Sequence, residues 1–158
     1  MLKEVSGDIL LTDAQVIVHG VAPDDHFNQG LALSLREQYP AMAKDFRHYC
    51  QVSHPKPGDL WTWASADGKR IVNLLTQEPA KSKQSHPGKA STHNVNHALR
   101  GLRKLAEEEG FTSMALPKLA TGVGGLNWDD VAPLIENQLG DLHMPIYVYT
   151  TYVKNQAA

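Results

Sequence analysis

Short apolar stretches alternate with longer helical patterns along this chain. Four of them, at residues 15–20, 71–76, 113–119 and 146–152, are too short and too continuously apolar for surface helices. Such stretches are typical of strands that are covered on both faces of a sheet. Residues 59–65 instead alternate, and the turn sequence ADGK at 66–69 connects them to the stretch at 71–76. We therefore predict a β-hairpin within a mixed sheet.

The clearest helical pattern occupies residues 91–110, with Ser91 suited to the N-cap and Gly110 to the C-terminal stop. Shorter patterns precede Pro40, follow Pro40, and follow Asn127, which is a candidate N-cap before an acidic first turn. Strands flanked by helices predict an α/β fold, a three-layer α/β/α sandwich with a central mixed sheet. The apolar faces of the four helices are Val95, Ala98, Leu99, Leu102, Leu105 and Ala106; Leu31, Leu35 and Tyr39; Met42, Phe46, Tyr49 and Cys50; and Val131, Leu134, Ile135 and Leu139.

Size and charge narrow the function classes. With 158 residues, the chain suits one domain over residues 1–158. Its formal net charge is -2, from 15 basic and 17 acidic residues, which argues against binding to extended nucleic acid. No stretch is apolar enough to span a membrane, and a single cysteine, Cys50, with a polar start to the chain suggests a reducing compartment. We expect a cytoplasmic monomer without a membrane partner.

Two loops that contain glycines are candidates for binding a ligand through backbone N–H groups. The sequence ATGVGG at 120–125 follows a predicted strand and precedes a helix, an arrangement that binds anions and above all phosphates. Glycines also form tight turns for their own sake, so this loop needs support from a second one. The segment at residues 22–35 again leaves an apolar strand, passes polar residues and a glycine, and enters a helix. Asp8 is suited to accept the amine of an adenine, or else to cap a turn. The combination suggests an adenosine diphosphate compound.

These motifs resemble the macrodomain family, whose fold binds ADP-ribose. The matching segments are GDIL at 7–10, VIVHG at 16–20, NQGLAL at 28–33 and LPKLATGVGGLNW at 116–128, in the family's order and spacing over nearly the whole chain. Within the family, the sequence is similar to the branch that contains the terminal ADP-ribose protein glycohydrolase, the macrodomain of an ADP-ribose-activated chromatin remodeller and the DNA ADP-ribosyl glycohydrolase antitoxins.

The resemblance implies a residue-level site. Asp8 and Ile9 would hold the adenine, which Tyr149 or Tyr152 would flank. Independently of the resemblance, the position of His19 at the end of an apolar strand predicts a hydrogen-bonded residue of the core or of the site wall. The distal ribose and one phosphate would be surrounded by His26, Phe27, Asn28, Gln29 and Gly30. The diphosphate would be surrounded by Thr121, Gly122, Val123, Gly124, Gly125 and Leu126.

Two positions depart from the glycohydrolase for which this branch is named. That enzyme carries its reaction on a lysine after the hairpin and an aspartate in the glycine loop, where this chain has Gln77 and Gly124. A glutamine amide is neither a nucleophile nor a useful base at neutral pH, so the lysyl route does not carry over.

Three interpretations stay open. Lys81 or Lys83, in the long loop after Gln77, would replace the missing amine. Alternatively, Gln77, Asn28 or the ligand's own phosphate would position a water that attacks the anomeric carbon of the distal ribose, while the glycine loop stabilises charge. The third is a reader that binds ADP-ribose without hydrolysing it.

We favour the water route, because an uncharged hydrogen-bonding side chain ends a strand beside a loop long enough to cover the ligand. The expected function is a hydrolase that removes ADP-ribose from protein side chains linked through Glu or Asp esters. The alternatives are the reader, and a hydrolase of ADP-ribosylated DNA or of a small ADP-ribose metabolite. No metal and no cofactor are expected: His93 and His97 have i, i+4 spacing but lie opposite the apolar face of their helix without an acidic partner.

Overall fold

A computed structural model of the chain describes residues 2–82 and 85–158. Its six strands form one sheet in the order β1-β6-β5-β2-β4-β3. All neighbouring strands are parallel except β3 and β4, which pair antiparallel as the predicted hairpin. The strands are β1 (Leu2–Gly7), β2 (Val16–Val21), β3 (Leu60–Ala64), β4 (Arg70–Leu75), β5 (Met114–Pro117) and β6 (Ile146–Tyr152).

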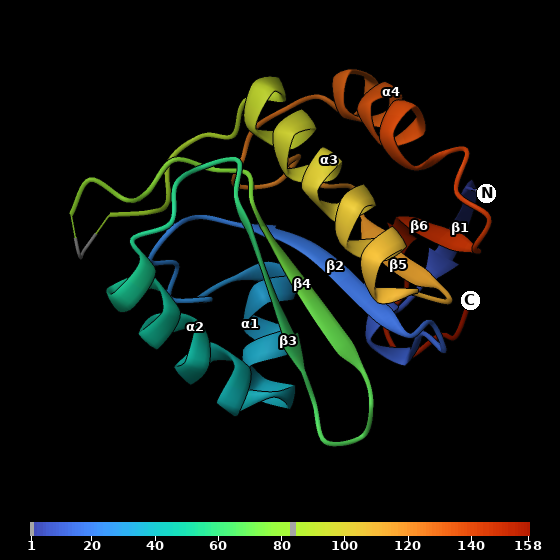
Figure 1. The fold of residues 1–158 in the computed structure, drawn as a ribbon, viewed down its shortest axis with the longest axis horizontal. Coiled ribbons are helices and arrows are strands. Elements are labelled where there is room, and N and C mark those ends of the chain that lie inside the picture. The colour runs from blue at the N-terminus through green and yellow to red at the C-terminus, as the bar shows by residue number, and fades with distance from the viewer. Residues whose placement is uncertain (1, 83–84) are drawn as a thin grey trace.

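Helices cover both faces of this sheet, which confirms the predicted three-layer α/β/α sandwich (Figure 1). Helices α1 (Gly30–Gln38) and α2 (Pro40–Ser53) lie on one face, whereas α3 (Thr92–Glu109) and α4 (Trp128–Leu139) lie on the other. The chain also has a short 3-10 helix, η1 (Ile9–Leu11). Among the described residues, no helix is both long and apolar enough to cross a bilayer.

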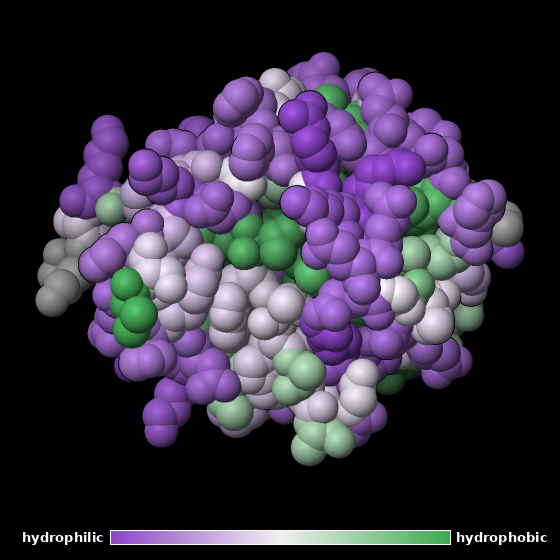
Figure 2. Space-filling model, viewed as in Figure 1, coloured by the Kyte–Doolittle hydropathy of each residue, from purple (hydrophilic) through white to green (hydrophobic). Residues whose placement is uncertain are grey.

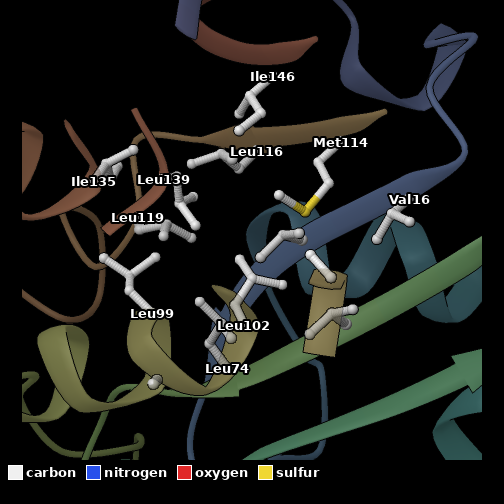
Figure 3. Close-up of a cluster of buried hydrophobic side chains, with 14 of the residues drawn as sticks. Val16, Leu74, Leu99, Leu102, Met114, Leu116, Leu119, Ile135, Leu139 and Ile146 are labelled. Atoms are coloured by element: carbon white, nitrogen blue, oxygen red, sulfur yellow. The ribbon is translucent and has the colours of Figure 1, made fainter. Parts of the chain in front are cut away.

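Alternate residues of the central strands supply the two cores. Val16 and Val18 of β2 pack towards α3 and α4, and Ile17 and Val21 pack towards α1 and α2. Figure 3 shows the first core, where side chains of α3, α4 and the strands interdigitate. Because β2 is buried on both faces, its sequence lacks the alternation of a half-exposed strand. On the outer surface, hydrophilic residues predominate over α2 and α3 in the view of Figure 2.

The helix ends test the capping predictions. Ser91 Oγ accepts the N–H of Asn94 at 3.1 Å, and Gly110 ends α3 in the left-handed region, as predicted. Asn127 occupies the N-cap of α4, as predicted, although its side chain forms no capping hydrogen bond. The backbone carbonyl of Asn127 instead accepts the N–H groups of Asp130 and Val131.

The sequence pattern did not predict strand β1. It lies at the edge of the sheet, where it pairs with β6 alone, and its residues Lys3 and Glu4 are exposed. An edge strand buries few side chains, so its sequence reads as polar. By pairing with β6, it brings Asp8 to the same edge of the sheet as the other predicted site residues.

Candidate functional site

The loops that follow the parallel strands meet at one edge of the sheet. Strands β5, β2 and β4 are neighbours, so the loops after Pro117, Val21 and Leu75 surround a single cavity of about 560 Å³. In an open α/β sheet, ligands bind outside these carboxyl ends. Of the predicted site residues, those that line the cavity are His19, His26, Asn28, Gln29, Gly30, Gln77, Gly122, Val123 and Gly124.

The glycine loop presents unpaired backbone donors. Its far end is closed by two hydrogen bonds, from Gly125 N to Gly122 O and from Leu126 N to Ala120 O, both 3.0 Å. Within the described part of the chain, no partner accepts from the four consecutive N–H groups of residues 121–124. Three of these four residues line the cavity. Successive free N–H groups are the usual donors of an anion-binding concavity, so this geometry is compatible with the predicted diphosphate contact, which stays a prediction.

The two glycines of this loop that line the cavity, Gly122 and Gly124, have different surroundings. Neither has a positive φ, unlike Gly125 with a φ of 76°. A Cβ on Gly122 would meet no atom within 4 Å, so a side chain there would extend into open space. A Cβ on Gly124 would lie 2.6 Å from the carbonyl oxygen of Ala120 and 3.0 Å from Cβ of Ala90. This backbone therefore has no room for the aspartate that the resemblance implies at position 124.

The side-chain carboxylate of Asp25 fixes the backbone conformation of the loop at residues 22–29. Asp25 accepts the N–H of Ala22 at 3.0 Å and that of Phe27 at 2.9 Å, which holds Phe27 at a φ of 56°. The ring of Phe27 is consequently buried between His19 and Phe46, so its side chain belongs to the core.

Helix α1 begins directly after this loop, and its first three residues, 30–32, line the cavity. No side chain caps its N-terminus. The free N–H groups of a helix N-terminus favour an anion. Sequence reasoning assigned a helix start to the glycine loop; the helix start that lines the cavity is that of α1, and no residue of α4 does so.

Arg36 was not predicted as a site residue, yet it positions one. Its Nη1 donates to the carbonyl oxygen of His26 at 3.0 Å and to Oδ1 of Asn28 at 2.8 Å. Because the Asn28 oxygen accepts from the guanidinium, its Nδ2 group remains a donor on the cavity wall. The one sequence feature that could have indicated this contact is the position of Arg36 about two helical turns after Asn28.

Gln77 lies at the base of the long loop and is 6% exposed. Its Nε2 donates to the carbonyl oxygen of Gly88 at 3.2 Å, which leaves Oε1 as an acceptor. Backbone hydrogen bonds between Glu78 and Gly88 and between Glu78 and Lys89 close the loop. Ala80, Ser85, His86 and Pro87 line the cavity, whereas Lys81 is exposed and does not. Lys83 lies outside the described residues.

His19 forms a row across three strands with Asn73 and Trp61. The strand register pairs His19 with Asn73 and Asn73 with Trp61. His19 Nε2 lies 2.5 Å from Asn73 Oδ1, and Asn73 Nδ2 donates to the carbonyl oxygen of Trp61 at 3.4 Å. Burial lowers the pKa of His19 below its ordinary 6.5, although Asn73 and Asp25 oppose that shift. The imidazole is therefore neutral at pH 7.

The residues expected around the adenine lie beyond the lining of this cavity. The Asp8 carboxylate accepts the N–H groups of Leu10 and Asn155, both at 3.1 Å, and is 5% exposed. Ile9 is buried, whereas Tyr152 is 65% exposed and pairs with Gly7 across the sheet edge. Tyr149 is buried in the core. Thr121, Gly125 and Leu126 also do not line the cavity. The adenine assignments stay predictions.

The fold and these loops define a class: an α/β sandwich with a cavity, lined by free backbone N–H groups, at the carboxyl edge of its parallel strands. The model of the Macro domain family matches residues 18–135, and the chain belongs to that family.

Named relatives agree with this membership. The DNA ADP-ribosyl glycohydrolase of Mycobacterium tuberculosis is 29% identical over 93% of this chain and 42% of its own length. The human ADP-ribose glycohydrolase OARD1 is 22% identical over 92% of this chain and 89% of its own. The structure of the macrodomain of Thermus aquaticus DarG matches with a TM-score of 0.81 and 25% identity, over 95% of this chain and 98% of that one. This chain thus spans less than half the length of the mycobacterial relative.

Proposed function

We propose that this chain binds ADP-ribose in the cavity and hydrolyses the bond between its distal ribose and an acceptor. The observation that carries the proposal is the run of four free backbone N–H groups at residues 121–124, beside a cavity that the N-terminus of α1 also lines. Donors from two elements suit the two phosphates of a diphosphate. The names of the mycobacterial and human relatives, both glycohydrolases of ADP-ribose or ADP-ribosyl groups, support the choice of ligand and reaction.

Hydrolysis proceeds here through water rather than a lysine. Gln77 contributes an acceptor, Oε1, because its nitrogen is bonded to Gly88. Asn28 contributes a donor, Nδ2, because its oxygen is bonded to Arg36. Both residues line the cavity, so an acceptor for an attacking water and a donor for a ribose hydroxyl are available on its walls. Positioning of this kind lowers the barrier most when the acceptor leaves easily, as a carboxylate does.

A reader without turnover is the second candidate. It is favoured by the two positions at which the resembled glycohydrolase has its lysine and aspartate, since Gln77 is uncharged and Gly124 has no room for a side chain. The long loop favours the enzyme, because four of its residues line the cavity and a loop that covers a site excludes water from its reaction.

Two classes of substrate differ in the group to which the ADP-ribose is attached. Ester-linked protein side chains fit the water route because of their leaving group. ADP-ribosylated DNA is the alternative that the mycobacterial relative's name favours, and a short modified strand needs no extended basic surface. We further propose that the chain acts as a single domain and a monomer in the cytoplasm.

One assay separates these possibilities. Radiolabelled ADP-ribose is attached to a glutamate-modified protein and, in a second reaction, to a DNA oligonucleotide, and its release is followed against buffer alone. Calorimetry with free ADP-ribose measures binding, for which we expect a micromolar Kd, or about -8 kcal/mol. Release above the buffer rate identifies the enzyme and its acceptor, whereas binding without release identifies the reader. No binding of ADP-ribose contradicts both.

A further inference from the structure

The water route needs a group that takes a proton from the attacking water. Gln77 and Asn28 are amides and have no basicity at neutral pH. A base must therefore come from another side chain of the cavity. The titratable residues that line it are His19, Asp24, Asp25, His26, His86 and Lys118.

Burial and existing hydrogen bonds distinguish these groups. Asp25 is committed to the backbone, since its two carboxylate oxygens accept from Ala22 and Phe27. Four others are exposed, so water competes for them: Asp24, His26, His86 and Lys118. His19 is 2% exposed and still lines the cavity. His19 is therefore the buried basic side chain among the residues that line the cavity.

The hydrogen bonds of Asn73 decide where the His19 proton resides. Asn73 Nδ2 faces the carbonyl oxygen of Trp61, an acceptor, so the amide nitrogen belongs on that side and Oδ1 on the side of His19. Flipping the amide would place two oxygens against each other. His19 Nε2 must then donate to Oδ1, and Nδ1 carries the lone pair.

Nδ1 is free to act. No described residue bonds it. Within the described chain, the enclosed side-chain atoms without a partner are Arg70 Nε and Thr76 Oγ1. Nδ1 is not among them, so it keeps some exposed surface, and His19 is a lining residue of the cavity. Since burial keeps the ring neutral by lowering its pKa, this lone pair is available at neutral pH. An oriented imidazole with one nitrogen donating and the other accepting is the usual arrangement of a general base.

We propose that His19 is the general base of this site and that Asn73 is the residue that positions it. The assignment rests on the proposed hydrolase function. As the water oxygen bonds to the anomeric carbon, one water proton passes to Nδ1. The bond from that carbon to the acceptor breaks, and its electron pair leaves with the acceptor. The imidazolium then returns its proton to solvent or to the released acceptor.

The magnitude follows from the chemistry of the reacting carbon. General bases contribute about 10² to 10⁴ in rate, and a transition state that resembles an oxocarbenium ion needs little push from the nucleophile. His19→Gln should therefore lower kcat/KM by about 100-fold, at the low end of that range. The Kd for ADP-ribose should stay within about threefold, because the base acts on water. His48→Gln is the matched control, since His48 is exposed on α2 and does not line the cavity.

The pH profile isolates the positioning role. Wild-type kcat/KM should fall on the acid side with a midpoint below 6.5, the ordinary pKa of histidine. Asn73→Asp places a charge on Nε2–H, so it should move that midpoint to higher pH, which a merely structural role for Asn73 would not do. The other titratable groups that line the cavity are unchanged in this comparison: Asp24, Asp25, His26, His86 and Lys118. Cys50, in the apolar cluster beneath, stays neutral because burial raises its pKa.

The test combines turnover of a radiolabelled, glutamate-ADP-ribosylated peptide with ¹⁵N NMR of the wild-type ring at pH 7.5. A 100-fold loss in His19→Gln, an unmoved His48→Gln, and ring shifts of the Nε2–H form support the proposal. If the wild type releases label and His19→Gln matches it within threefold, the base assignment is wrong and the hydrolase stands. A ring protonated on Nδ1 also overturns it, without requiring any variant to fold. A wild type that releases nothing overturns the hydrolase itself.

Discussion

Replacing Gly124 with alanine should destabilise the whole domain, although only a methyl group is added. The new Cβ would lie 2.6 Å from the Ala120 carbonyl oxygen and 3.0 Å from Cβ of Ala90. The nearest of these contacts is with backbone, so no side-chain rotation relieves it. The glycine loop has to move, which weakens the hydrogen bonds from Ala90 N to Gly124 O and from Leu126 N to Ala120 O.

The magnitude follows from these contacts. Overpacking costs about 1–3 kcal/mol, and a net hydrogen bond contributes about 1 kcal/mol. We expect Gly124→Ala to lower the free energy of unfolding by about 2 kcal/mol, or Tm by about 4–8 °C for a domain of this size. Gly122→Ala is the control, because its Cβ meets no atom within 4 Å and its φ is not positive. Its stability should stay within about 0.5 kcal/mol of the wild type.

Thermal and urea unfolding of the two variants side by side provide the measurement. Calorimetry with ADP-ribose adds a second readout: Gly122→Glu should keep the wild-type Tm and lose binding, since its side chain enters the cavity with a like charge. Gly124→Asp should lose more stability than Gly124→Ala and gain no activity. Equal Tm values for Gly124→Ala and Gly122→Ala would refute the account of close packing at position 124.

Three further predictions concern other parts of the site. Gln77→Ala should lose about tenfold in turnover, or about 1.4 kcal/mol, whereas Lys81→Ala should stay within a few-fold; a borohydride-trapped adduct on Lys81, seen by intact mass spectrometry, would contradict the water route. Because the folded-state pKa of His19 lies below 6.5, the unfolded chain binds this proton more tightly, so the free energy of unfolding should fall as pH drops below about 6.5. Urea titrations between pH 8 and 5 test this, and His19→Gln should lessen the slope. Asp8→Ala should lower the free energy of unfolding by about 2 kcal/mol, since two backbone N–H groups lose their acceptor. If Asp8 also holds the adenine, the same variant should weaken ADP-ribose binding by about 1.5–3 kcal/mol. An unchanged Kd would place the adenine elsewhere.

Local patterns determined a large part of this protein. The apolar runs of the central strands and the apolar faces of the helices predicted the layers, because burial on both faces of a parallel sheet imposes these patterns whatever the order of the strands. Ser91 and Gly110 predicted the ends of α3, since caps act within one turn. The glycine loop and the family motifs likewise lie within short segments, so the family and a candidate anion site could be predicted from the chain.

Tertiary structure decided what depends on neighbours distant in sequence. Only the sheet order shows β1 at an edge and brings Asp8 beside the end of the chain. Only the packing distinguishes Gly124, crowded by Ala90, from the open Gly122. The strand register pairs His19 with Asn73, which sequence shows merely as a polar residue within an apolar strand. A hydrogen bond between residues 54 positions apart has no local signal, and it is such bonds that orient the donors and acceptors of this cavity.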